Sequence, residues 1–86
     1  MKKLDKKQQL MVITMEECGE LQQVCSKILR IAEIDDEYGI KLVEELGDVY
    51  CMLKLMAEHG ICTWTELEEQ AKIKRRKLDK WSDITI

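Results

Sequence analysis

Hydrophobic residues in the first third of the chain recur in alternating steps of four and three. Between about Asp5 and Ile31 this stripe consists of Leu10, Thr14, Glu17, Leu21, Val24, Ile28 and Ile31. Such spacing is typical of a helix that packs one face against a bundle. Asp5 and Gln8 have the spacing of a capping box. The pattern therefore predicts a long first helix over these residues.

The same pattern returns twice. From about Glu37 to Glu58 the stripe is Tyr38, Leu42, Glu45, Val49, Met52 and Met56. Gly60 then provides the left-handed residue that commonly ends a helix. The third helix begins at Thr63, where Thr63 and Glu66 form a capping box, and its stripe is Trp64, Leu67, Ala71, Lys74, Leu78 and Trp81. We expect residues 82–86 to form a frayed tail.

The fold class follows from this pattern. The chain has no proline and is rich in good helix formers, so we expect an all-α fold in a single domain over residues 1–86. A short acidic turn, Ala32 to Asp36, joins the first two helices, with Asp35 or Asp36 as the cap. It implies that these helices are antiparallel neighbours. With 86 residues the core is thin, which favours oligomerisation.

Two acidic residues interrupt the apolar stripes. Glu17 and Glu45 each lie in mid-stripe, and Glu20 and Asp48 follow three residues later. Counted from the shared turn, all four lie near one level of an antiparallel pair. Four carboxylates cannot share a dry site without a cation. We predict that these four residues bind metal, the alternative being a solvated acidic face.

Oxygen ligands select a hard cation, so Mg²⁺ is favoured and Mn²⁺ is the second choice. The single histidine, His59, lies at the far end of the second helix, which argues against zinc or iron.

Glu16 is an additional acid beside the predicted ligands and a candidate catalytic residue, although it faces away from the stripe. Gly19 and Gly47 each precede an acid, and either close approach of a ligand or backbone or tight helix packing explains them.

The charges are unevenly distributed. The formal net charge is −3, yet bases gather at residues 72–80. A nucleic-acid binder is more often basic overall, so this separation suits a metal-bound polyphosphate better. The candidates for contacting substrate phosphates are Lys27, Arg30, Lys72, Lys74, Arg75 and Arg76. For each of them singly, a solvated helix face is the alternative.

The four cysteines, at positions 18, 25, 51 and 62, form no CxxC pair. We expect reduced, half-buried thiols in a cytoplasmic protein. The apolar run from Leu10 to Met15 is too short for a signal peptide, and no run is long enough to span a membrane.

The motifs Glu-Glu-x-x-Glu at 16–20 and Glu-x-x-Asp at 45–48, with Lys27 and Arg30 between them, resemble those of MazG-like all-α nucleoside triphosphate pyrophosphohydrolases. The resemblance covers roughly residues 10 to 80. It implies hydrolysis of an NTP or dNTP to the monophosphate and pyrophosphate, with Mg²⁺ on Glu17, Glu20, Glu45 and Asp48. It also implies a homodimer or dimer of dimers, in which helices of two chains complete a four-helix bundle and the substrate pocket.

Two other interpretations stay open at this point. One is a non-catalytic helical dimerisation or adaptor module whose acids bind a basic surface. The other is the related phosphoribosyl-ATP pyrophosphohydrolase, which shares the helical plan. The acids in mid-stripe favour the enzyme, because a pure interaction module has no reason to place Glu17 and Glu45 in its core.

Overall fold

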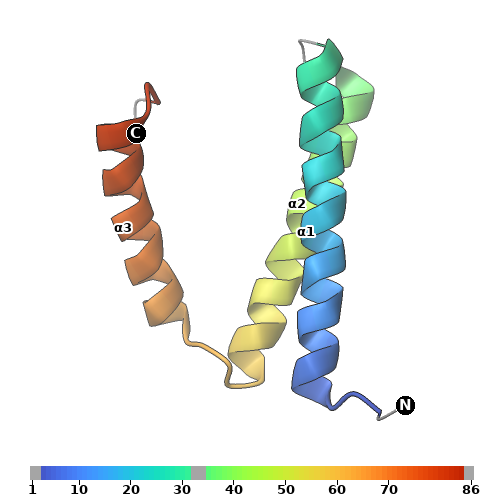
Figure 1. Ribbon diagram of the computed structural model, residues 1–86, viewed down its shortest axis with the longest axis vertical. Helices are drawn as coiled ribbons and strands as arrows, with labels where there is room; N and C mark the ends of the chain where they lie inside the picture. The colour runs from blue at the N-terminus through green and yellow to red at the C-terminus, as the bar shows by residue number, and fades with distance from the viewer. Residues whose placement is uncertain (1–2, 32–34, 85–86) are drawn as a thin grey trace.

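A computed structural model describes residues 3–31 and 35–84, and within these ranges the chain consists of three α-helices without a strand. Helix α1 spans Lys6–Ile31, α2 spans Asp36–Glu58 and α3 spans Trp64–Trp81 (Figure 1). The predicted all-α class is therefore confirmed, and the helix bounds agree with the sequence pattern to about one residue. Most of the predicted turn, residues 32–34, and the last two tail residues, 85 and 86, lie outside the described residues.

Local hydrogen bonds explain where the helices begin. The Gln8 amide donates to Asp5 Oδ1 at 2.8 Å, and the Asp5 amide donates to Gln8 Oε1 at 3.0 Å. Asp35 accepts from the Tyr38 amide at 2.8 Å and so caps α2. The reciprocal capping box at the start of α3 is also present, between Thr63 and Glu66. These side chains satisfy amide groups that no helical carbonyl can reach.

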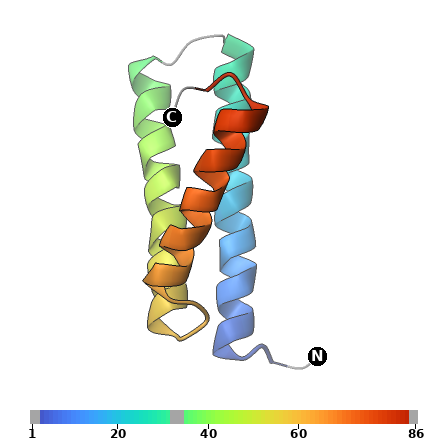
Figure 2. The same ribbon diagram turned by 90° about the vertical axis from the view of Figure 1, so that its left-hand side faces the viewer.

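Helices α1 and α2 form an antiparallel pair, with α2 behind α1 in Figure 1 and beside it in Figure 2. Among the described residues, the buried hydrophobic ones are Leu10 and Val24 of α1 and Met52 of α2. The other predicted stripe positions of the pair are half-buried, except Ile31, which is exposed. The core of the chain is therefore a single thin seam between two helices.

Helix α3 diverges from this pair (Figure 1) and makes almost no contact with it. Gly60, with φ of +73°, turns the chain between α2 and α3 as predicted. None of the described residues of α3 is buried, and within its stripe Leu67 and Leu78 are only half-buried. Lys74 lies exposed in the middle of that stripe. The third helix therefore does not join the core within one chain.

No helix within residues 3–31 and 35–84 combines the length and the apolarity needed to cross a bilayer.

The prediction that the thiols are half-buried needs a correction. Cys18, Cys25 and Cys51 are exposed and only Cys62 is half-buried, all four as free cysteines. Three thiols are exposed because the helix faces that carry them are not covered by another element of the chain.

Candidate metal centre

Four carboxylates meet where α1 and α2 face each other. Glu17 and Glu20 come from α1, and Glu45 and Asp48 come from α2. Each offers one oxygen, and these oxygens all lie within 4.8 Å of one another. The i, i+3 spacing on each helix puts one acid at the seam and the next at its edge. The structure thus brings together the four residues that the sequence pattern singled out.

The two seam residues carry polar atoms without a partner. Glu17 and Glu45 are half-buried, and the Oε2 atom of each is buried without a hydrogen bond. Burial, followed by the negative charges of Glu20 and Asp48, raises the pKa of both carboxyls. A buried acceptor without a donor is costly, so the arrangement calls for a cation or for protons.

The donor set matches a hard divalent cation. Carboxylate oxygens are the ligands that Mg²⁺ and Mn²⁺ prefer, and none of the four residues offers nitrogen or sulfur. Around an octahedral Mg²⁺ with bonds of about 2.1 Å, opposite ligands lie about 4.2 Å apart. The oxygens lie within 4.8 Å of one another, slightly beyond that value, so the side chains would have to move closer together to bind one ion.

One edge of the cluster is open to solvent. Glu20 and Asp48 are exposed, whereas Glu17 and Glu45 are half-buried. An ion held here would have one side free for water or other oxygen ligands, as Mg²⁺ sites commonly do. Glu16 is exposed and lies outside the cluster, one helical turn before Glu20. It is therefore placed beside the site rather than in it.

The glycines beside the acids have room around them. A Cβ atom built on Gly19 or on Gly47 would meet nothing within 4 Å. Tight packing of the described helices therefore does not explain either glycine. A ligand or another chain approaching these positions is the remaining explanation from the sequence pattern.

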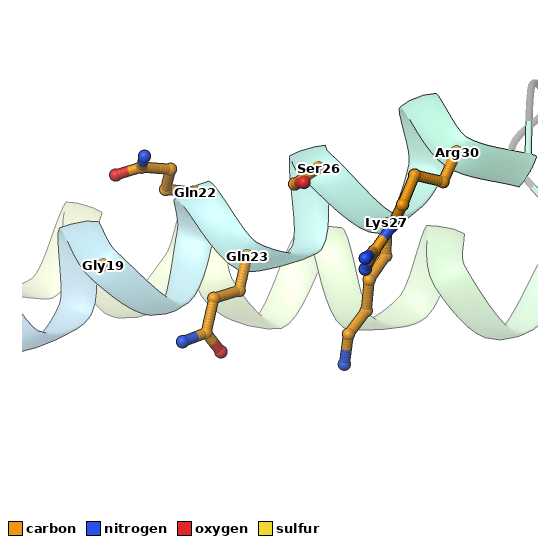
Figure 3. A pocket seen from close by; sticks show the side chains of 6 residues that line it. All are labelled: Gly19, Gln22, Gln23, Ser26, Lys27 and Arg30. Atoms are coloured by element: carbon orange, nitrogen blue, oxygen red, sulfur yellow. The ribbon is translucent and has the colours of Figure 1, made fainter.

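Lys27 and Arg30 lie farther along α1 than the acids. Both are exposed and line a shallow hollow on this helix together with Gly19, Gln22, Gln23 and Ser26 (Figure 3). Sequence reasoning missed the two glutamines and Ser26 as polar neighbours of the bases. Gln22 and Gln23 lie three and four residues after Gly19, and Ser26 lies four residues before Arg30. This helical spacing is the signal that would have found them.

The other predicted phosphate ligands are on α3. Lys72, Lys74, Arg75 and Arg76 are all exposed, and Lys72 Nζ lies 3.6 Å from Glu69 Oε1 within the same helix. Since α3 diverges from α1 and α2, the structure does not bring these bases to the carboxylates within one chain (Figure 1).

None of the protein-family models, curated proteins or solved structures searched matches this chain.

Proposed function

We propose that this protein is a Mg²⁺-dependent nucleoside triphosphate pyrophosphohydrolase of the MazG-like type. One observation carries the proposal: four carboxylates from two antiparallel helices converge within 4.8 Å, and two of them hold buried oxygens without partners. A helical pair that only had to be stable would gain from apolar residues at these seam positions. The acids therefore have a use, and holding a hard cation is the use that their chemistry supports.

In this proposal Glu17, Glu20, Glu45 and Asp48 hold Mg²⁺, with Mn²⁺ as an alternative ion. When bound, the metal supplies neutralisation of phosphate charge and activation of a water molecule. The reaction adds water across the bond between the α- and β-phosphates of an NTP or dNTP and releases the monophosphate and pyrophosphate. Glu16, exposed beside the cluster, can accept the proton of the attacking water.

The basic side chains contribute to substrate binding through their positive charge. Lys27 and Arg30 extend from the helix that carries Glu17 and Glu20, so they can reach phosphates that protrude from the metal site. The family resemblance implies an oligomer, a homodimer or dimer of dimers. Helix α3 makes almost no contact with the rest of its own chain, and it carries Lys72, Lys74, Arg75 and Arg76. These four bases are therefore candidates to serve a neighbouring subunit.

The test is release of pyrophosphate from a panel of canonical and modified NTPs and dNTPs, with Mg²⁺, Mn²⁺ or EDTA. We expect release that requires the metal and yields a monophosphate. The matched variants are Glu45→Gln, which changes the cluster, and Glu68→Gln, which changes an exposed glutamate of α3 outside it. Only the first should abolish turnover.

The panel also separates the competing functions. Phosphoribosyl-ATP belongs in it, because turnover of that substrate alone would assign the related enzyme of the same helical plan. The adaptor interpretation is favoured by the exposed apolar residues of α1 and α2. Absence of turnover on every nucleotide, in protein shown to be folded and oligomeric, would reject the enzyme and favour the adaptor.

A further inference from the structure

The side of the α1–α2 pair that carries Glu20 and Asp48 is ordered in steps of seven residues, and we call it the carboxylate side. The two acids share one level of the pair, because their oxygens lie within 4.8 Å of each other. Seven residues make nearly two helical turns, with a rise of about 10.5 Å and a rotation of only about 20°. Since the helices are antiparallel, seven residues forward on α1 and seven backward on α2 lead to the same next level.

Two lysines occupy the next level towards the connection between α1 and α2. Lys27 follows Glu20 by seven residues, and Lys41 precedes Asp48 by seven. Both lysines are exposed, and neither forms an ion pair with a carboxylate of the described residues. One lysine from each helix therefore lies about 10.5 Å along the pair from the acids, on the same side.

The level beyond the acids in the other direction is apolar. Ile13 precedes Glu20 by seven residues, and Leu55 follows Asp48 by seven. Ile13 is 40% exposed and Leu55 is half-buried. The carboxylate side thus presents three levels in a row, which are cationic, anionic and apolar.

Pairing within one helix does not account for the lysine level. Surface lysines commonly pair with acids three or four residues away, and Lys41 has Glu37 and Glu44 at this spacing. Within residues 3–31 and 35–84, however, the one ion pair joins Lys72 and Glu69 on α3. The positive charges at this level are therefore available to a ligand.

The order of the three levels matches the order of chemical groups in a nucleoside triphosphate. Its outer phosphates carry the negative charge that ammonium groups bind. A metal held by the acids acts on the phosphates nearer the sugar, where the proposed cleavage occurs. The faces of the base are apolar and suit branched aliphatic side chains, which commonly line ligand pockets. The flexible four-carbon stem of each lysine can bridge part of the roughly 10.5 Å between its level and the metal.

We propose that the nucleoside triphosphate lies along the carboxylate side in one direction. Its β- and γ-phosphates point to Lys27 and Lys41, and its sugar and base lie against Ile13 and Leu55. Lys41 is then a phosphate-positioning residue, and the two apolar residues are nucleoside contacts. This inference rests on the proposed pyrophosphohydrolase function. It concerns one wall of the pocket, so a neighbouring chain can complete the other wall.

The experiment measures binding to the full chain by calorimetry in the presence of Mg²⁺, with two kinds of probe. Inorganic tripolyphosphate represents the phosphate chain alone. The α,β-methylene analogues of ATP and dTTP represent the whole nucleotide, and the proposed reaction cannot cleave them. Lys41→Gln should weaken binding of both kinds of probe about tenfold, and Lys41→Arg should retain most of the affinity because it keeps the charge. Ile13→Gln should weaken binding of the nucleotide analogues about threefold or more and leave tripolyphosphate binding unchanged.

Two matched controls lie away from the carboxylate side. Lys7→Gln removes an exposed lysine that lies about 160° around α1 from Lys27. Val12→Gln changes a residue that is 41% exposed and lies about 100° around α1 from Ile13. Neither control should change the binding of any probe. All these variants should keep the rise in Tm with Mg²⁺, because none of them alters the four carboxylates.

Pyrophosphate release by the wild type separates this inference from the function on which it rests. If the wild type releases pyrophosphate but Lys41→Gln binds the probes no more weakly than Lys7→Gln, the orientation is overturned and the function stands. Loss of tripolyphosphate binding in Ile13→Gln instead of Lys41→Gln would likewise overturn the orientation. In protein that releases no pyrophosphate, the expected pattern of probe binding would retain the three levels as a nucleotide site, and absence of binding would overturn it.

Discussion

Replacing Glu45 by glutamine tests the carboxylate cluster most directly. The change keeps the shape of the side chain but removes one of four anionic ligands and puts an amide where a carboxylate oxygen now faces three others within 4.8 Å. Since α2 keeps its length, its cap and its buried Met52, helical content should stay near that of the wild type. The lost property should be the response to metal.

The magnitude follows from linkage between binding and folding. Metal at about ten times its Kd should raise the Tm of a domain of this size by roughly 6–11 °C. Changes to groups that only support a metal ligand cost about 10- to 100-fold in affinity, so loss of a ligand should cost at least about 100-fold. At the same metal concentration the variant should then gain less than about 1 °C.

The assay is thermal unfolding followed by circular dichroism at neutral pH, with EDTA or with increasing Mg²⁺, alongside pyrophosphate release. Glu68→Gln is the control and should respond to metal as the wild type does. In EDTA the Glu45→Gln variant should be at least as stable as the wild type, because burial and the charges of Glu20 and Asp48 disfavour the ionised Glu45. A variant that keeps the full metal response or its turnover would refute the assignment of Glu45 to the site.

Further predictions concern individual side chains and pH. Glu16→Gln should reduce turnover less than Glu17→Gln, because Glu17 belongs to the cluster and Glu16 does not; the reverse order would show that the helix phase is wrong. In EDTA, the free energy of unfolding should fall as the pH rises above about 4.5, the ordinary pKa of a glutamate. The pKa values of Glu17 and Glu45 are raised in the folded state. Protonation of these two carboxyls therefore stabilises the fold fully below the ordinary glutamate pKa, and this stabilisation is lost as the pH rises through the raised pKa values. Denaturant titration of the wild type against a Glu17→Gln, Glu45→Gln double variant checks this, since the double variant should lose that pH dependence. Met52→Ala should cost about 2–5 kcal/mol in the same titration, because Met52 is 4% exposed in the α1–α2 seam; a cost below about 1 kcal/mol would show that the seam is not the core.

The cluster could be predicted from the sequence because two regular quantities define it. The helical period determines which residues share a face, and the short connection determines the level at which the two helices meet. Glu17 and Glu45 stood out because each interrupts an apolar stripe. The helix bounds were equally accessible, since capping groups such as Asp5 and Thr63 act within three or four residues of the chain.

The packing of α3 could not be predicted, because an amphipathic stripe indicates that one face of a helix packs against something but not against which element. Leu67 and Leu78 follow the same period as Val24 and Met52, yet only the latter two are buried. The exposed thiols have the same origin. Their burial depends on whether a helix packs over them, which no local pattern encodes.

The sequence by itself determined the three helices, their caps and the common level of four acids, because these follow from local hydrogen bonding and from one helical period. Only the tertiary structure decided which carboxylate oxygens are buried without a partner, and where Lys27 and Arg30 lie relative to the acids. The physical reason is that burial and electrostatics depend on neighbours distant in sequence. Those distances are set only when α1 and α2 pack together and α3 stays apart.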